Sequence, residues 1–187
     1  LLRDAGYRTA MVGKWHLGAS EEFMPLRHGF GEFFGVPHSN DEKNFFVWDG
    51  ERRIPEAVEQ SRLIRRYTDR ALAFLDAAAR DDQPFFLYVA PYAPLSPSTP
   101  APRHAGLLAD QAYPRTPAFD EPDVGDKPST IRDLPRLAEW ELEAIDRHGR
   151  ERAQSIQSVD EMVRQIVEAL ERTGELDNTY IVYASDN

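Results

Sequence analysis

Cysteine is absent from this 187-residue chain, and so is any long apolar run. Without cysteine no disulfide can form, and thiol usage gives no indication of the redox compartment. No apolar stretch approaches the ~20 residues that a membrane-spanning helix needs. The chain starts at Leu1 with no basic-then-apolar signal segment, and it stops directly behind an apolar stretch. We therefore expect an internal segment of a longer protein.

Basic side chains are scarce: 22 Lys and Arg stand against 32 Asp and Glu, for a net charge of -10. This balance argues against a nucleic-acid partner, whose phosphates attract basic surfaces. It does not exclude an anionic small molecule or glycan, because binding depends on local charge at the site. With 41% hydrophobic and 29% charged residues, the composition is typical of one globular domain.

Three short apolar segments are predicted to be buried strands. Residues 9–13 are apolar and end at a glycine, whereas residues 84–90 and 179–184 combine aromatic and aliphatic side chains. The latter two are nearly continuous in apolar residues, as strands covered on both faces are.

Helical periodicity lies between these strands. Apolar residues recur every three or four positions over residues 64–78 and 156–170, and Gly174 stands where a helix C-cap glycine belongs. A weaker helix is predicted over residues 137–148. Helices that alternate with buried strands predict an α/β fold with a parallel sheet. Residues 91–128 hold nine of the fourteen prolines and are predicted to be a long loop, which is more often functional than decorative.

Polar residues that directly follow strands are the first candidates for a site, because ligands of such sheets bind beyond the carboxyl ends of the strands. Residues 13–18 place Lys14 and His16 between glycines that allow close backbone approach. Lysine offers a charge to an anion and histidine can transfer a proton near neutral pH; a solvated turn is the alternative. At the end of residues 179–184, Asp186 and Asn187 offer oxygen donors suited to a hard cation, or form an Asx turn.

These segments together resemble the sulfatase family. Residues 6–18 are similar, nearly residue for residue, to that family's second signature, and residues 25–35 resemble the segment that follows it. Residues 183–187 resemble its metal-binding strand end. The resemblance implies an incomplete alkaline-phosphatase-like sulfatase catalytic domain, with a parallel or mixed sheet flanked by helices. Residues 1–187 would be part of a single N-terminal catalytic domain, truncated at both ends.

The resemblance also assigns roles to individual residues. Lys14 would hold the sulfate and the oxygen of the nucleophile, and His16 would hydrogen-bond a hydrated formylglycine and help collapse the sulfated intermediate. Ser39 aligns with a serine that contacts substrate in arylsulfatase-type members. Asp186 and Asn187 would be two ligands of one divalent cation, Ca²⁺. The implied partner is a sulfated small molecule or glycan.

Two departures from the family pattern stand out. The family's nucleophile, a cysteine or serine in a Cys/Ser-x-Pro-x-Arg motif that becomes formylglycine, should lie upstream of Leu1. Residues 98–103 imitate this motif but place Arg103 one position too late. At Leu95 most relatives have a histidine that contacts sulfate and assists the leaving oxygen. Loss of such a proton donor could cost on the order of 10²–10⁴ in rate.

The sequence therefore predicts a sulfuric ester hydrolase acting on a sulfated sugar or an aryl sulfate. Residues 114–119 and 158–180 resemble the N-acetylglucosamine-6-sulfatase branch, whereas residues 37–41 resemble arylsulfatases, and the longer match favours the first. A phosphatase or phosphodiesterase of the same superfamily is one alternative, although the signature at residues 14–16 is not expected there. A sulfated-glycan-binding homologue without catalysis is the other, and Leu95 favours it.

Overall fold

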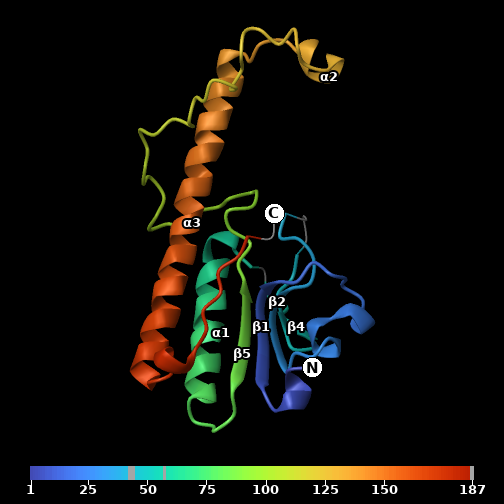
Figure 1. The fold of residues 1–187 in the computed structure, drawn as a ribbon, viewed down its shortest axis with the longest axis vertical. Coiled ribbons are helices and arrows are strands. Elements are labelled where there is room, and N and C mark those ends of the chain that lie inside the picture. Colours follow the sequence, from blue (N-terminus) through green and yellow to red (C-terminus); the bar gives the residue numbers. More distant parts are fainter. Residues whose placement is uncertain (42–44, 57, 186–187) are drawn as a thin grey trace.

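The computed structural model describes residues 1–41, 45–56 and 58–185. Its centre is a mixed sheet of order β4-β3-β2-β1-β5 (Figure 1). Strand β1 pairs in parallel with both β2 and β5, whereas β3 and β4 form a short antiparallel hairpin beside β2. The strand bounds are Arg8–Lys14 for β1, Glu32–Val36 for β2, Trp48–Asp49 for β3, Arg52–Arg53 for β4 and Phe85–Ala90 for β5. The predicted strands at residues 9–13 and 84–90 and the mixed sheet are confirmed.

Two long helices, α1 (Leu63–Ala78) and α3 (Glu139–Thr173), form layers beside the sheet, with α1 between the sheet and α3 (Figure 1). The predicted helix at residues 64–78 is thus confirmed, and Gly174 ends α3 in the left-handed conformation with φ 78°. A one-turn helix, α2 (Ser129–Arg132), lies far from the sheet. Short 3₁₀ turns complete the described elements: Arg3–Ala5, Glu21–Phe23, Pro25–Arg27, Gln60–Arg62 and Leu176–Asn178. In the described part of the chain, no helix is both long and apolar enough to cross a membrane.

The main core lies between the sheet and the helices. Val12 and Phe34 of adjacent strands contact Tyr67 of α1 and Met162 of α3 in one apolar cluster. The ring of Tyr67 meets that of Phe34 edge-on at 6.3 Å between centroids. On the opposite face, Met11 and Phe33 are covered by a smaller cluster around Met24. The sheet is therefore packed on both faces over β1 and β2, which fixes the strand ends that carry the candidate site.

The two helices predicted over residues 137–148 and 156–170 are a single helix. Gly149 stands between them, and a glycine inside a helix costs roughly 1 kcal/mol without interrupting the hydrogen-bond ladder. A side chain at this position would begin 2.9 Å from the ring of Tyr113. Gly149 therefore allows the loop before α3 to lie directly on the helix backbone.

The strand predicted over residues 179–184 is not found. After α3 and its 3₁₀ turn, residues 179–185 run without ladder hydrogen bonds to any described strand. Tyr180, Val182 and Tyr183 are largely exposed. An apolar pattern indicates a tendency to form a strand, but a strand exists only where a neighbouring strand supplies its backbone partners.

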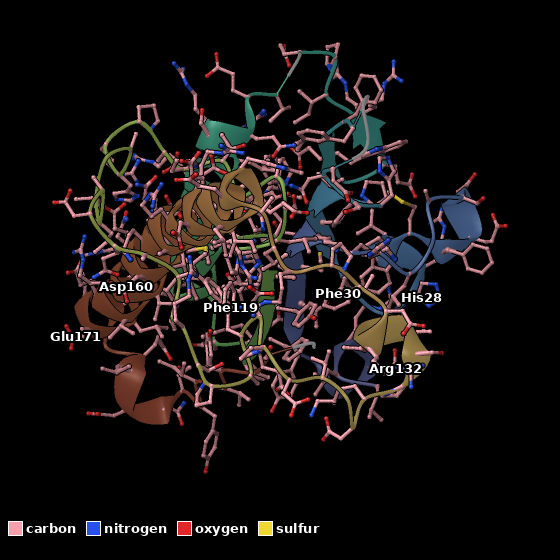
Figure 2. The ribbon with its side chains drawn as sticks, turned by 90° about the horizontal axis from the view of Figure 1, so that it is seen from above. His28, Phe30, Phe119, Arg132, Asp160 and Glu171 are labelled. Carbon is pink, nitrogen blue, oxygen red and sulfur yellow. The ribbon has the colours of Figure 1, made fainter. Side chains whose placement is uncertain are left out.

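Strand β5 is half-exposed rather than covered on both faces as predicted. Its side chains alternate, and Phe86 and Tyr88 keep 37% and 46% of their surface. Phe30 stacks against both, at 6.1 and 6.4 Å between ring centroids. Figure 2 shows Phe30 on the side of the sheet opposite Asp160 and Glu171 of α3. As an edge strand of the described sheet, β5 has a neighbouring strand on one side only.

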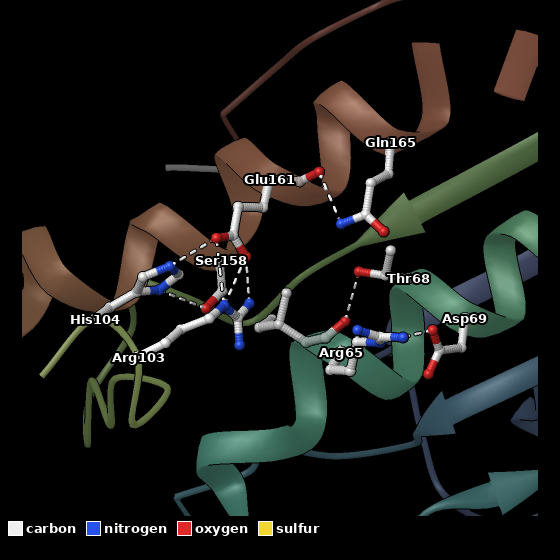
Figure 3. A network of polar contacts seen from close by, with 9 residues as sticks. Arg65, Thr68, Asp69, Arg103, His104, Ser158, Glu161 and Gln165 are labelled. Carbon is white, nitrogen blue, oxygen red and sulfur yellow. Dashed lines mark hydrogen bonds and ion pairs between the residues drawn. The ribbon is translucent and has the colours of Figure 1, made fainter. Parts of the chain in front are cut away.

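The predicted loop over residues 91–128 is irregular, and its middle part is fastened to α3. His104 Nε2 lies 2.9 Å from Glu161 Oε1, and Ser158 Oγ lies 3.2 Å from His104 Nδ1 (Figure 3). Arg103 Nε adds a 3.0 Å hydrogen bond to the same carboxylate. This geometry fits an imidazole that donates from Nε2 to Glu161 and accepts the Ser158 hydroxyl at Nδ1. The buried ring of His104 thereby clamps the loop onto the helix.

Acid should release this clamp. Hydrogen bonds from Arg103 and then His104 lower the pKa of Glu161 to about 2. A carboxyl group with a depressed folded-state pKa stabilises the fold above its unfolded value near 4.5, and that stabilisation disappears as pH falls through about 2. We expect Glu161→Gln to lower the free energy of unfolding by about 1 kcal/mol at pH 7. The difference from wild type should shrink as pH falls from 4.5 towards 2, measured by chemical denaturation; a difference that stays constant with pH would contradict it.

Candidate functional site

Two glycines at the carboxyl end of the sheet stand where the backbone of a neighbouring strand leaves no room for a Cβ atom. Gly13 of β1 and Gly35 of β2 are partners in the parallel register. A Cβ atom on Gly35 would lie 1.8 Å from the carbonyl oxygen of Gly13, and one on Gly13 would lie 2.0 Å from that of Ala90 in β5. Only glycine permits this approach. The residues that follow Gly13 and Gly35 are thereby held in one small region.

The turn after β1 presents Lys14 and His16. Lys14 ends the strand half-buried, and the next two residues donate backbone hydrogen bonds across to the chain after β2. These bonds run from Trp15 N to Val36 O and from His16 N to Pro37 O, both at 2.9 Å. The indole Nε1 of Trp15 donates to Phe23 O at 2.7 Å. The turn is therefore fixed on both sides while the His16 side chain stays exposed.

His16 has a backbone conformation that is rare for a residue with a side chain. Its φ is 58°, in the left-handed region. Such conformations cost of order 1–3 kcal/mol and persist where surrounding contacts impose them, often at functional sites. At His16 one such contact is the backbone hydrogen bond to Pro37 O, while the side chain stays exposed.

The turn after β2 carries Ser39 and Asp41, and the residue between them, Asn40, holds it to Gln60. Asn40 is buried, its carbonyl accepts a hydrogen bond from Gln60 Nε2, and its Nδ2 lies 3.5 Å from Gln60 Oε1. Tyr92, just after β5, donates to the carbonyl of Gln60 at 2.8 Å. Burial raises the pKa of the Tyr92 hydroxyl to about 12, so it remains a donor at neutral pH. The turn is thus tied to the chain that follows the third strand.

Ser39, Lys14 and His16 all act on the carboxylate of Asp41. The side chain of Ser39 hydrogen-bonds to that carboxylate and is the main cause that lowers its pKa. A backbone hydrogen bond and the charges of Lys14 and His16 lower it further. Lys14 and His16, expected from the sequence to be catalytic, and Ser39, expected to contact substrate, thus all lie at the ends of β1 and β2.

Two buried polar atoms have no hydrogen-bond partner among the described residues: Asn40 Oδ1, in the turn after β2, and the hydroxyl of Tyr67, in α1. Burial raises the pKa of Tyr67 far above its ordinary value, so its hydroxyl is neutral. Unsatisfied buried groups are uncommon in native proteins, and each costs about 1–3 kcal/mol.

The loop after β5 places Leu95 one turn from that strand. Its backbone N–H closes a turn onto Tyr92 O at 2.9 Å, and its side chain keeps 42% of its surface. Within the segment that imitates the nucleophile motif, Ser98 is buried and its hydroxyl donates to Pro94 O at 2.9 Å. Arg103 is engaged by Glu161. Through these contacts Ser98 and Arg103 stabilise the loop after β5.

The predicted cation ligands Asp186 and Asn187 lie outside the described residues. Within residues 1–41, 45–56 and 58–185, no group of three or more His, Cys, Asp or Glu side chains could hold a metal ion. Oxygen donors of the Asp and Asn type do suit Ca²⁺. The described residues therefore do not by themselves form a cation cage.

Comparison with known proteins identifies the family. The sulfatase family profile matches residues 1–187. An arylsulfatase of Volvox carteri is 33% identical over the whole chain, which spans 32% of that protein. The N-acetylgalactosamine-6-sulfatase of Mus musculus is 30% identical, again over the whole chain and 32% of the relative. The chain therefore belongs to the sulfatase family and spans about a third of the length of these relatives.

Solved structures show the same fold. A structure described as a complex with its substrate D-glucosamine-2-N,6-O-disulfate superimposes with a TM-score of 0.64 at 23% identity, over 95% of this chain and 47% of the other. A crystal structure named Ps i-CgsB gives a TM-score of 0.63 at 20% identity, over 95% and 37%. The mixed sheet with its flanking helices is thus part of an alkaline-phosphatase-like sulfatase fold.

Sequence reasoning did not assign a role to Asp41 or to the Asn40–Gln60 anchor. The position of Asp41, in the turn after β2 and two residues from Ser39, was the available signal. Gln60 lies 20 residues further along the chain and carries no motif. Its contact with Asn40 is visible only in the folded structure.

Proposed function

We propose that the full-length protein hydrolyses sulfate monoesters of a sulfated sugar or an aryl compound. The observation that carries the proposal is the convergence of Lys14, His16 and Ser39 beyond two parallel strands in a chain of the sulfatase family. Residues 1–187 would form part of a single catalytic domain.

Each of the three side chains suits one need of sulfate-ester cleavage. Negative charge develops on the transferred group, and a preoriented ammonium such as that of Lys14 stabilises it better than water does. Ser39 can donate a hydrogen bond to a sulfate oxygen. His16, exposed at the site and able to carry or release a proton near neutral pH, can assist the collapse of a covalent sulfated intermediate.

Two groups outside the described residues complete the proposal. A formylglycine upstream would supply the nucleophile, and one divalent cation, with Asp186 and Asn187 among its ligands, would neutralise charge on the sulfate. The names of the relatives, arylsulfatase and N-acetylgalactosamine-6-sulfatase, support a sulfated aryl or sugar substrate. A 6-sulfated N-acetylhexosamine is the substrate class we favour, and N-acetylglucosamine 6-sulfate is the particular sugar that the sequence resemblance suggests.

A matched pair of substrates tests the proposal. Full-length protein, produced with its formylglycine-forming modification, should hydrolyse p-nitrophenyl sulfate at least ten times faster than p-nitrophenyl phosphate. N-acetylglucosamine 6-sulfate should release sulfate, measured by ion chromatography. Faster hydrolysis of the phosphate would favour a phosphatase of the same superfamily instead.

Leu95 supports a second candidate, a protein that binds sulfated glycans without turning them over. Leucine can neither donate a proton to a leaving oxygen nor hydrogen-bond to sulfate. Saturable binding of a sulfated oligosaccharide by calorimetry, together with no sulfate release over a day, would establish this candidate. Measurable turnover would exclude it.

A further inference from the structure

A cavity of about 440 Å³ lies between the loop over residues 91–128 and the first half of α3. Its volume falls within the ~300–1,000 Å³ that is usual for small-molecule sites. One loop residue and one face of the helix line it: Tyr113, Ala144, Ile145, His148, Gly149 and Arg152. The first half of α3 extends past the carboxyl ends of the strands (Figure 1). The cavity is therefore displaced from the sheet towards the end of the molecule at which the candidate site lies.

The loop that forms one wall of the cavity is fastened to α3. Three helix side chains, each four residues from the next, hold it: Asp146, Arg150 and Gln154. Asp146 Oδ1 accepts the backbone N–H of Tyr113 at 2.7 Å. Arg150 Nη1 and Gln154 Nε2 donate to loop carbonyl oxygens at 3.1 and 2.6 Å. Because side chains four residues apart lie on one stripe of a helix, this stripe binds the loop and the stripe beside it lines the cavity.

The aromatic wall of the cavity is the ring of Tyr113. Gly149 admits it, because a Cβ atom at Gly149 would lie 2.9 Å from Tyr113 Cδ2. The tyrosine still keeps 44% of its surface exposed. Ala144 and Ile145 add aliphatic side chains to the lining. The cavity thus offers a fixed aromatic ring and an apolar surface to a ligand.

Hydrogen-bond donors complete the lining. His148 and Arg152 are four residues apart on α3 and therefore lie side by side. Within the described residues, neither side chain has an ion pair or a hydrogen bond. The guanidinium has five N–H donors, and the imidazole donates from at least one nitrogen in either charge state. No carboxylate of the described chain lines the cavity, and the nearby Asp146 is paired with Arg115 at 2.8 Å. An anionic group would find these donors available.

We infer that this cavity is an accessory subsite for a sulfated sugar residue other than the one that is cleaved. A sugar ring has an apolar face of C–H groups that packs on an aromatic ring such as Tyr113. Its sulfate group matches the fork of Arg152, which binds oxyanions through two donors. The inference rests on the proposed function, and it specifies that the substrate is an oligosaccharide.

The position along α3 explains why a chain of sugars is needed. Helix α3 meets the sheet at Val159, which shares an apolar cluster with Val12 of β1. His148 precedes Val159 by eleven residues, or roughly 16 Å at the rise of an α-helix. This exceeds the length of one sugar ring. A glycan of several residues can therefore occupy both the cavity and the strand ends, whereas a monosaccharide cannot.

The experiment measures binding and turnover of a keratan sulfate hexasaccharide, whose N-acetylglucosamine residues carry 6-sulfate, by full-length protein. Arg152→Ala should raise the calorimetric Kd of this hexasaccharide roughly three- to tenfold, because a charge-assisted hydrogen bond is lost. Alanine is a strong helix former, so α3 should persist. KM should rise in parallel for the hexasaccharide and by a smaller factor for p-nitrophenyl sulfate. Tyr113→Ala should act in the same way through loss of the aromatic wall.

Arg147→Ala is the matched control, because it removes the same charge from the same helix at an exposed position outside the cavity lining. It should leave Kd and both KM values unchanged. The desulfated hexasaccharide should bind wild type more weakly than the sulfated one and should not distinguish wild type from Arg152→Ala. In 0.5 M NaCl the effect of Arg152→Ala should diminish, because exposed charges are screened.

Several outcomes would overturn the subsite. The inference is wrong if Arg152→Ala and Tyr113→Ala bind the hexasaccharide as wild type does, or if Arg147→Ala weakens binding equally. A lowered melting temperature in Arg152→Ala with unchanged hexasaccharide binding would show that another part of the protein fills the cavity, and it would overturn the inference as well.

The subsite and the enzymatic proposal fail in different ways. Hydrolysis of p-nitrophenyl sulfate and of the hexasaccharide, with equal constants in wild type and Arg152→Ala, overturns only the subsite. Hexasaccharide binding that is weakened by Arg152→Ala, without any sulfate release by wild type, overturns only the enzymatic proposal. Absence of both binding and turnover in wild type overturns both.

Discussion

Replacing Lys14 with alanine in the full-length protein should lower kcat/KM for p-nitrophenyl sulfate by about 10²–10³. Removing one preorganised group at a site of developing negative charge costs roughly 3–4 kcal/mol in other enzymes. Folding should change little, because Lys14 ends β1 half-buried and contributes little to the core. Steady-state kinetics beside thermal melting of the same samples makes the comparison.

Lys14→Arg should recover only part of this loss. The planar guanidinium keeps the charge but replaces a compact ammonium, and its fork has a different reach. Lys127→Ala is the control, since Lys127 lies in a loop remote from the sheet and pairs with Asp126. It should retain wild-type activity. If Lys14→Ala remains fully active, or loses activity only by unfolding, the turn after β1 is structural and the sulfate-site proposal is wrong.

The local spacing of apolar residues was sufficient to predict the helices and strands that bury one regular face. The spacing over residues 64–78 predicted α1, and Gly174 marked the end of α3. The apolar stretches that became β1 and β5 were recognisable for the same reason. Each of these segments packs against a neighbour within the described chain, so local preference and tertiary contact agree.

The sequence pattern did not predict the structure where contacts with distant parts of the chain determine it. Residues 179–184 have strand-like composition, yet no described strand pairs with them. Residues 137–148 and 156–170 were predicted as two helices, yet α3 is continuous and Gly149 accommodates Tyr113 against it. Strand β2 was not predicted because its five residues include a glycine and a glutamate. Its burial depends on β1 beside it and on the clusters that cover each face.

The sequence names candidate residues for the site but does not specify their geometry. Lys14, His16 and Ser39 follow from the family resemblance, and their order along the chain is visible in the sequence. Their convergence depends on the parallel pairing of β1 with β2, which a linear pattern does not specify. Function at this edge therefore depends on how closely the strands approach one another.

That approach makes Gly35 the position with the largest expected effect on stability. In Gly35→Ala the new Cβ would begin 1.8 Å from the carbonyl oxygen of Gly13, which belongs to rigid backbone. Strands β1 and β2 must separate at the end that carries the site. Overpacking of this kind typically costs 1–3 kcal/mol, and because no flexible side chain can yield here we expect about 3 kcal/mol or more. Chemical denaturation of wild type and variant measures the difference.

The same substitution should impair activity beyond its effect on folding. Separation of the strands moves Lys14 away from Ser39, so kcat/KM should fall even at temperatures where Gly35→Ala is fully folded. A displacement of about 1 Å in a catalytic arrangement can cost on the order of 10²-fold. Gly125→Ala is the matched control, because its Cβ would meet only the Asp123 side chain, at 3.3 Å, in an exposed loop. Equal stability and activity in Gly35→Ala and Gly125→Ala would show that the strand ends tolerate separation, and that the close glycine contact does not position the site.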